Sequence, residues 1–196
     1  MWLLRKVVAK ISPQSFWRMY AKDFFLDPWQ HAIFPQQKDL LRFIKKNKVH
    51  TILEAGCGFG RNLQYLVEHG VPATHLHGVD ITSSLLKKAC QVPILKQAVL
   101  ESADVLNLPY QNNNFDLVFT HGLLMHIPPK KIEKAFRELI RTSRKYVVIY
   151  EEVSKQGNIN TYTYGHDYFQ LAKTYKLKML FSIVDNRKLL WMHLEK

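Results

Sequence analysis

The chain has 196 residues, of which 47% are apolar, and this size suits one globular domain with one core. No apolar run approaches the roughly 18 residues that cross a bilayer, and two cysteines do not make a disulfide framework, so we expect a cytoplasmic protein. The net charge of +12 suggests an anionic substrate, a nucleic acid or an acidic surface, although a basic solvated surface accounts for it equally well.

The first 34 residues are predicted to form a helical cap. Residues 1–22 contain no Asp or Glu, and their apolar residues recur at roughly helical spacing among basic ones. Such a segment can make weak contact with a membrane surface, but a lid over a ligand cleft is the favoured interpretation. A secretory signal is not expected, because no small-residue cleavage site follows. Residues 12–34 are rich in aromatics: Phe16, Trp17, Tyr20, Phe24, Phe25, Trp29 and Phe34.

Beyond residue 34, helical and strand patterns alternate along the chain. The predicted helices cover 35–47, the segment from the glycine-rich turn to near Gly70, the segment capped by Thr82 or Ser83, 129–142 and 166–175. The predicted strands cover 50–55, 75–80, 99–103, 115–120 and 145–151. Two further apolar runs, 178–184 and 188–194, flank Asp185-Asn186 and indicate a hairpin. We therefore predict a single α/β domain over 35–196.

A glycine-rich turn follows the first of these strands. Residues 52–60 read Ile-Leu-Glu-Ala-Gly-Cys-Gly-Phe-Gly, and Asp80 closes the next strand, 20 positions after Gly60. Glycines let the backbone approach a ligand closely, and a carboxylate can accept two hydrogen bonds from a ribose diol. This pattern predicts that a nucleoside-containing cofactor binds at the carboxyl ends of parallel strands.

The glycine spacing distinguishes between cofactors. The dinucleotide fingerprint G-x-G-x-x-G needs a third glycine at position 61, which is Arg61. The spacing is instead G-x-G-x-G with Glu54 two residues upstream, and this resembles motif I of the class I S-adenosylmethionine-dependent methyltransferases. The resemblance implies S-adenosyl-L-methionine as the cofactor. It also implies a Rossmann-like fold with a mostly parallel seven-stranded sheet and a C-terminal antiparallel hairpin.

The resemblance assigns roles around the cofactor. Glu54 would help to hold the methionine end, the glycines would pass beneath the cofactor, and Asp80 would bind the ribose hydroxyls. The stretches 102–109 and 114–128 resemble the family's motifs after strand three and at strand four, and Asp104 would contact the adenine amino group. The implied cofactor-binding residues are Glu54, Gly56, Cys57, Gly58, Gly60, Asp80, Ile81, Asp104, Val105 and His121.

Three histidines are candidate catalytic bases, because imidazole accepts protons near neutral pH. His121 ends strand four, where the family places residues that face the methyl group, and ordering the cofactor edge is its alternative role. His126 lies in an apolar-His-apolar turn, which it commonly braces in the family. His166 follows strand five, in the region that usually builds the acceptor pocket. The predicted acceptor-binding residues are Tyr20, Tyr150, Glu151, Tyr164 and His166, although Glu151 could instead cap a loop.

The strand-four sequence excludes several subgroups. It lacks the Asn/Asp-Pro-Pro-aromatic sequence of base and glutamine methylases, and no cysteine stands where a cytosine-C5 methylase needs one. Thr120 and His121 stand where metal-dependent enzymes place an aspartate, so no metal is implied. Residues 120–129, 138–146 and 164–166 are similar to small methylases that accompany pseudaminic acid biosynthesis, although these tend to have Lys at position 121. This similarity implies an acidic sugar or a surface-glycan precursor as the acceptor.

Three functions fit these observations. The leading hypothesis is methyl transfer to an O or N atom of a small, anionic molecule. An RNA- or ribosome-associated methyltransferase would use the positive charge and the aromatic, basic N-terminus, but a nucleic-acid partner is not favoured. A non-catalytic module that binds the cofactor or a partner protein is the third. The methyl acceptor and the oligomeric state are not determined at this level.

Overall fold

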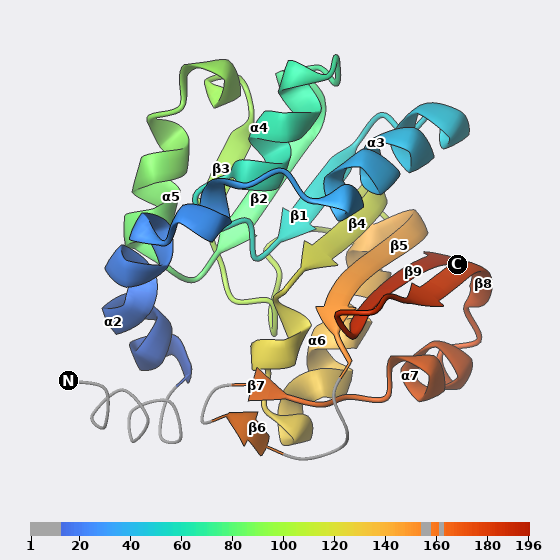
Figure 1. The fold of residues 1–196 in the computed structure, drawn as a ribbon. Helices are drawn as coiled ribbons and strands as arrows, with labels where there is room; N and C mark the ends of the chain where they lie inside the picture. The colour runs from blue at the N-terminus through green and yellow to red at the C-terminus, as the bar shows by residue number, and fades with distance from the viewer. Residues whose placement is uncertain (1–12, 154–157, 161–162) are drawn as a thin grey trace.

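The structure is a computed structural model that describes residues 13–153, 158–160 and 163–196, and its centre is a seven-stranded sheet (Figure 1). The strand order is β3-β2-β1-β4-β5-β9-β8. All neighbours from β3 to β5 are parallel, whereas β9 is antiparallel to both β5 and β8. The strands are β1 (Ile52–Ala55), β2 (Leu76–Asp80), β3 (Val99–Ser102), β4 (Phe115–His121), β5 (Ser143–Glu152), β8 (Lys178–Val184) and β9 (Leu189–Glu195). The predicted mostly parallel sheet with a terminal hairpin is confirmed.

Helices cover both faces of this sheet (Figure 1). On one face lie α3 (Pro35–Asn47), α4 (Arg61–Glu68) and α5 (Ser83–Cys90), and on the other lie α6 (Ile132–Thr142) and α7 (Tyr168–Thr174). Each face has its own apolar core, because the side chains of a central strand alternate between the two layers. The strand order reverses between β1 and β4, and such a switch point opens a crevice at the carboxyl ends of the strands.

Most element boundaries differ from the predictions by one to three residues, which is the usual uncertainty of helix and strand ends. The largest difference is at 129–142, where the α-helix starts only at Ile132. A short 3-10 helix, η5 (Pro129–Lys131), precedes it, since Pro128 and Pro129 have no N–H to donate. The other 3-10 helices are η1 (Pro28–His31), η2 (Ala73–His75), η3 (Pro93–Leu95) and η4 (Leu124–His126).

The segment after β5 contains a small two-stranded sheet that was not among the predicted strands. Strands β6 (Asn158–Asn160) and β7 (Thr163–Tyr164) pair antiparallel and lie beside η4. In Figure 1 they lie below the carboxyl ends of the central strands. Short, polar strands of this kind carry no clear apolar alternation, so the sequence pattern did not reveal them.

The predicted N-terminal cap is helical in the part that the structure describes. Helix α2 (Pro13–Leu26) packs beside α5, with Phe16 and Ala21 buried and the Lys88 ammonium 3.8 Å from the centre of the Phe25 ring. Residues 1–12, which carry much of the predicted membrane-contacting segment, lie outside the described residues. Whether residues 1–34 act as a separate unit therefore stays a prediction.

Candidate functional site

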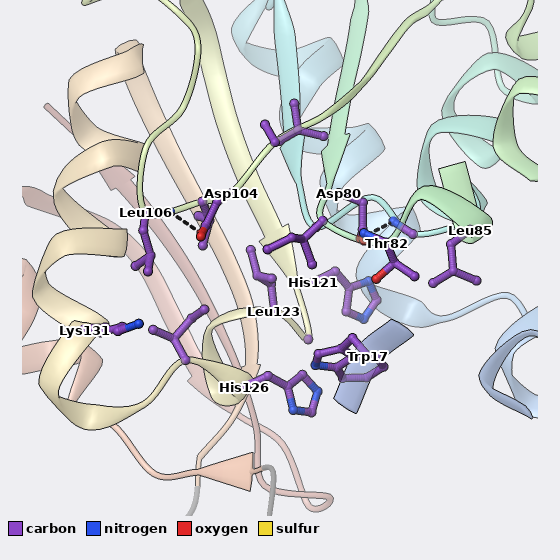
Figure 2. Close-up of a pocket in the computed structure, with 18 of the residues that line it drawn as sticks. Trp17, Asp80, Thr82, Leu85, Asp104, Leu106, His121, Leu123, His126 and Lys131 are labelled. Atoms are coloured by element: carbon purple, nitrogen blue, oxygen red, sulfur yellow. Dashed lines mark hydrogen bonds between the residues drawn. The ribbon is translucent and has the colours of Figure 1, made fainter. Parts of the chain in front are cut away.

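A pocket lies at the carboxyl ends of β1, β2 and β4 (Figure 2). The glycine-rich turn forms its floor, the segments 79–82 and 103–106 form one side, and the segment 121–128 forms another. Helix α2 contributes Trp17 and Phe24 from the cap, and Lys131 closes the end near α6. The pocket therefore occupies the crevice that the strand order creates, as predicted from the glycine-rich turn.

The glycines of the turn have two different roles. Gly56 and Gly58 line the pocket at φ values of +79° and +55°, which side chains rarely adopt. A Cβ on Gly58 would meet only Leu85 Cδ1, at 3.9 Å, so this glycine leaves open space towards the pocket. A Cβ on Gly60 would instead lie 2.8 Å from Leu95 Cδ1. Gly60 thus permits helix packing and does not line the pocket.

Cys57 points away from the pocket. Its side chain is buried against β2, where a Cβ on Gly78 would lie 2.9 Å from its sulfur. Burial, with the nearby Glu54 and Asp80 carboxylates, raises the pKa of the thiol well above its ordinary value. A protonated, buried thiol is a poor nucleophile. The resemblance implied a cofactor contact for Cys57, but this residue does not line the pocket.

Asp80 ends β2 and fixes the shape of the glycine-rich turn. Its Oδ2 accepts a hydrogen bond from the Gly58 N–H at 2.9 Å, and its Oδ1 accepts one from the Thr82 N–H at 2.7 Å. Burial raises the pKa of this carboxyl above its ordinary value, although both hydrogen bonds act in the opposite direction. Each carboxylate oxygen has a second lone pair, so Asp80 can still accept hydrogen bonds from a ligand in the pocket.

Asp104 starts a turn just after β3, on the same side of the pocket as Asp80. Its Oδ1 accepts a hydrogen bond from the Leu106 N–H at 2.9 Å, and its carbonyl accepts one from the Asn107 N–H at 2.8 Å. Asp104, Val105 and Leu106 all line the pocket, as does Ile81 after β2. Two acidic residues thus face the pocket from two adjacent strand ends, as predicted.

A buried polar chain lies behind the glycine-rich turn. Glu54 is fully buried, and its Oε1 accepts a hydrogen bond from the Asn62 side chain at 2.6 Å. Burial raises the pKa of Glu54 to about 8, and its Oε2 has no hydrogen-bond partner in the described structure. The Asn62 Oδ1 lies 3.3 Å from His121 Nδ1. Since an amide oxygen only accepts, Nδ1 of His121 donates in this arrangement, and its Nε2 has the free lone pair.

His121 lines the pocket as a neutral imidazole. Burial and the positive charge of Arg61 lower its pKa to about 3. Arg61 itself donates to the carbonyl and to the side-chain oxygen of Gln30, at 3.2 and 3.1 Å, so the cap is tied to this end of the site. An imidazole with so low a pKa is a weak base, so His121 is better suited to hydrogen bonding than to removing a proton.

His126 lies on the cap side of the pocket. Its ring centre is 4.6 Å from that of Trp17, edge to face, and both residues line the pocket (Figure 2). Trp17 and Phe24 are seven positions apart on α2, which places both rings on the same helix face. Their shared face was visible in the sequence, but its partner was not, because α2 and η4 are about a hundred residues apart.

Two predicted acceptor residues are instead internal braces. The Tyr150 hydroxyl donates to Asp39 at 2.8 Å, in the layer beneath α3. Glu151 is fully buried: Oε1 accepts from the Thr120 hydroxyl and the Leu123 N–H, and Oε2 accepts from the Met125 N–H. Both were predicted acceptor residues because they end β5, but the hydrogen bonds of Glu151 match its alternative role of capping a loop. Successive strand residues point to opposite faces, and neither of these two lines the pocket.

The other three predicted acceptor residues also lie outside the pocket wall of the described chain. His166 is buried, and its Nε2 lies 2.9 Å from the Ile127 carbonyl, so it supports the segment that carries His126. Tyr164 is half-buried on β7, and Tyr20 stacks on Phe16 with ring centres 5.4 Å apart. The pocket residues that we did not predict are Trp17, Phe24, Val79, Thr82, Leu85, Ala103, Leu106, Gly122, Leu123, Ile127, Pro128 and Lys131.

Two further features can be stated for the described residues. They contain no group of three or more His, Cys, Asp or Glu side chains arranged to hold a metal ion. None of their helices combines the length and the apolar character that a membrane crossing requires.

Known proteins resemble this chain in sequence and in fold. Residues 52–145 match the family model described as a methyltransferase domain. Phosphoethanolamine N-methyltransferase of Plasmodium falciparum is 28% identical over 102 residues, which cover 52% of this chain and 38% of that protein. Norajmaline N-methyltransferase of Rauvolfia serpentina is 28% identical over 156 residues, which cover 67% of this chain and 51% of that protein. The chain spans only 27% to 38% of the length of three phosphoethanolamine N-methyltransferases that it matches.

Solved structures show the same fold. Magnesium protoporphyrin IX methyltransferase of Synechocystis with bound S-adenosylmethionine superposes with a TM-score of 0.71 at 15% identity, over 94% of this chain and 96% of that one. The same enzyme with bound S-adenosylhomocysteine superposes with a TM-score of 0.70. At this identity the likeness shows the fold, and it does not identify a substrate.

Proposed function

We propose that this protein transfers a methyl group from S-adenosyl-L-methionine to an O or N atom of a small, anionic molecule; the match of residues 52–145 to a methyltransferase-domain family model supports this. One observation carries the proposal. Gly58, Asp80 and Asp104, three residues with assigned cofactor roles, face one pocket at the switch point of the sheet.

The residues fit this cofactor on two structural grounds. The missing Cβ of Gly58 leaves space in the pocket that a branched side chain would fill. The unpartnered Oε2 of Glu54 is a buried acceptor that suits an ammonium donor, such as the amino group of a methionine moiety. Asp80 would accept from the ribose hydroxyls while it braces Gly58 and Thr82.

When bound, the cofactor supplies an activated methyl group on a sulfonium. The protein must align an acceptor with that methyl group and must accept a proton where the acceptor carries one. His126 suits the second task, since it lines the pocket on the cap side. His121 suits hydrogen bonding at the methionine end, because its imidazole is neutral and is oriented by Asn62. His166 would act through the backbone that carries His126.

The proposal of an anionic acceptor rests on the single Lys or Arg side chain among the described residues that line the pocket. Lys131 lines it, and no ion pair is found for this ammonium within the described residues. The curated relatives include enzymes named for phosphoethanolamine, which is a small phosphate ester. An acidic sugar or glycan precursor, which the similarity to the pseudaminic-acid methylases implies, is also negatively charged. The two acceptors are told apart by direct assay.

The test is calorimetric titration of the purified protein with S-adenosylmethionine and S-adenosylhomocysteine. We expect micromolar binding that Asp80→Ala weakens at least about 10-fold, because a charged hydrogen-bond acceptor is lost. Asp116→Asn is the matched control: Asp116 also accepts backbone N–H groups, from His50 and Thr51, but at the opposite end of the sheet. Absence of binding in the wild type would overturn the proposal.

The acceptor screen follows cofactor binding. Phosphoethanolamine and acidic sugars are tested before RNA, and formation of S-adenosylhomocysteine is the readout. Turnover of RNA alone, with steep salt dependence, would replace the small-molecule proposal with the nucleic-acid one. Cofactor binding without turnover on any acceptor would favour a non-catalytic module. Vesicle flotation of the full chain, with and without residues 1–22, tests the proposed membrane contact.

A further inference from the structure

The segment between β3 and β4 has almost no regular structure, yet it carries one side of the pocket. Residues 103–106 line the pocket, and residues 107–114 then lead back to β4. Its local order comes from the turn at Asp104–Asn107, which a single isolated β-bridge closes. A segment with so few internal hydrogen bonds needs external partners for its backbone groups. Helix α6 supplies them.

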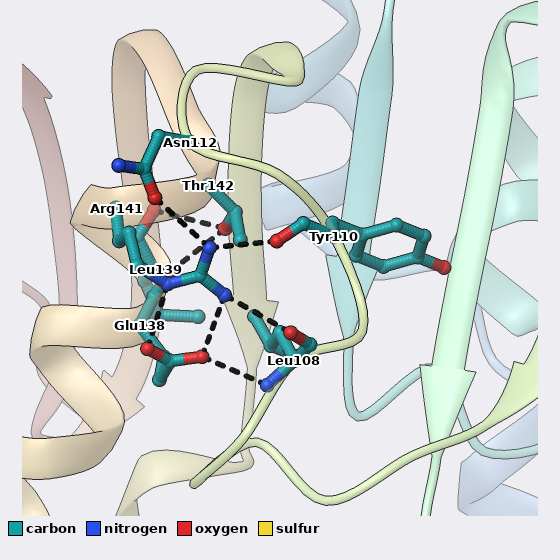
Figure 3. A network of polar contacts seen from close by, with 7 residues as sticks. All are labelled: Leu108, Tyr110, Asn112, Glu138, Leu139, Arg141 and Thr142. Carbon is teal, nitrogen blue, oxygen red and sulfur yellow. Dashed lines mark hydrogen bonds and ion pairs between the residues drawn. The ribbon is translucent and has the colours of Figure 1, made fainter.

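Arg141, in the last turn of α6, binds this segment at three points (Figure 3). Its Nη2 donates to the Leu108 carbonyl at 3.0 Å, and its Nη1 donates to the Tyr110 carbonyl at 2.6 Å and to the Asn112 side chain at 3.1 Å. The Arg141 carbonyl also accepts from the Asn113 N–H at 2.8 Å. One residue thus fixes the return path of the segment.

Glu138 orients Arg141 and completes the clamp. Its two oxygens accept from Nε and Nη2 of Arg141, both at 2.8 Å, and Oε2 also accepts from the Leu108 N–H at 2.8 Å. The N–H of Leu108 is therefore held by Glu138, and its carbonyl by Arg141 (Figure 3). The ion pair lowers the pKa of Glu138, as expected for a hydrogen-bonded carboxylate.

This arrangement needs the shape of a guanidinium group. Arg141 uses three nitrogens in one plane to bind a carboxylate and two carbonyls, whereas a lysine ammonium is a point charge without that fork. Leu108 is nearly fully buried and follows Asp104 by four residues. Glu138 and Arg141, the clamp, therefore hold the chain four residues after Asp104, whose carboxylate faces the pocket.

We propose that Glu138 and Arg141 are positioning residues for recognition of the cofactor's base. They hold the backbone of Leu108 and Tyr110, and this fixes the position of the preceding turn at Asp104–Leu106. The Asp104 carboxylate and the backbone amides of the turn are then held in place for contact with the adenine ring. The inference rests on the proposed function, since it assumes that this side of the pocket receives the adenine. Neither residue lines the pocket, so both act through the segment between β3 and β4.

The test compares two ligands in Arg141→Lys. One is S-adenosylhomocysteine, and the other is S-inosylhomocysteine, in which an oxo group replaces the adenine amino group. We expect Arg141→Lys to lower the affinity for S-adenosylhomocysteine about 10-fold and the affinity for S-inosylhomocysteine less than about 2-fold. The ratio of the two affinities, which measures discrimination between the bases, should therefore fall. Glu138→Gln keeps an acceptor for Leu108 and should lower the discrimination about 3-fold.

Arg137→Lys is the matched control, because Arg137 lies on the same helix with an exposed side chain. It should leave both affinities unchanged. Equal weakening of both ligands in Arg141→Lys and Glu138→Gln would mean a general structural role and would overturn the proposal. If Arg141→Lys does not fold, the discrimination ratio of Glu138→Gln decides alone. Failure of the wild type to bind S-adenosylhomocysteine would instead refute the proposed function.

Discussion

The two sides of the pocket are built from different kinds of interaction. On the side of the glycine-rich turn, short hydrogen bonds fix the backbone: Asp80 accepts from Gly58 and Thr82, and the Val79 carbonyl accepts from Gly56 at 2.8 Å. On the cap side, aromatic rings meet, with Trp17 at 4.6 Å from His126 and at 5.5 Å from Phe24. Hydrogen bonds impose distance and direction, whereas ring contacts tolerate several arrangements.

The difference matches the two ligands that the proposed methyl transfer needs. The cofactor is the same molecule in every S-adenosylmethionine-dependent methyltransferase, so a fixed set of directional hydrogen bonds can recognise it. The acceptor varies between enzymes, and a wall of rings on a separate helix can change without disturbing the sheet. The cofactor side should therefore respond sharply to single substitutions, and the cap side should respond selectively.

The largest effect is expected for Gly58→Val. The new side chain would enter the space that Gly58 leaves open, so affinity for S-adenosylhomocysteine should fall at least about 100-fold in calorimetry. Gly70→Val is the matched control: Gly70 also has a positive φ, +93°, but nothing lies within 4 Å of its Cβ position and it does not line the pocket. Equal loss of binding in both variants would show that backbone strain, and not occupation of the pocket, is the cause.

An intermediate and selective effect is expected for Trp17→Ala. Loss of the ring should raise the KM of the acceptor identified by the screen about 10-fold. The dissociation constant of S-adenosylhomocysteine should change less than about 3-fold, because the cofactor is held by the opposite side. Met19→Ala, an exposed position on the same helix, serves as the control. A parallel loss of both affinities would mean that the cap covers the cofactor as well, and the two-sided comparison would fail.

The smallest effect concerns stability and pH at Glu54. Its pKa is about 8 in the folded protein against 4.5 unfolded, so the folded state binds more protons between these values. The stability contributed by the neutral group is present below pH 4.5 and is lost as the pH rises towards 8. The Tm of the wild type should therefore fall by several degrees from about pH 6.5 to about pH 8.5, beyond the fall seen in Glu54→Gln.

His121 does not obscure this measurement. Its lowered pKa makes stability rise with pH only between about 3 and 6.5, below the window used. Glu68→Gln, at an exposed carboxylate on α4, should follow the wild type. A Glu54→Gln protein with the same Tm slope as the wild type would contradict the assignment of a neutral, buried Glu54.

Much of the fold was predictable because local patterns agreed with one another. The turn at 56–60, the acid at position 80 and the terminal hairpin were each visible in short stretches of sequence, and together they defined the sheet. The cofactor side of the pocket followed directly, since parallel strands bring their carboxyl ends to one edge. Asp80 and Asp104 were placed correctly at that edge for this reason.

The acceptor side was not predictable in the same way. Tyr150 and Glu151 lie near the end of the correct strand, but the direction of each side chain depends on how β5 packs against α3 and against the segment that leads into η4. Trp17 of α2 and Lys131 of η5 line the same pocket although they are more than a hundred residues apart in the chain. The clamp of Glu138 and Arg141 likewise joins groups about 30 residues apart.

The amino-acid sequence by itself determined the class of fold, the glycine-rich turn and the acids beside it, because those features arise from local backbone geometry and strand periodicity. The tertiary structure alone decided which side chains form the cap side of the pocket and which carboxylates are internal braces. Those outcomes depend on long-range packing, which sets the direction of each side chain and the burial of each charge, and no short stretch of sequence contains that information.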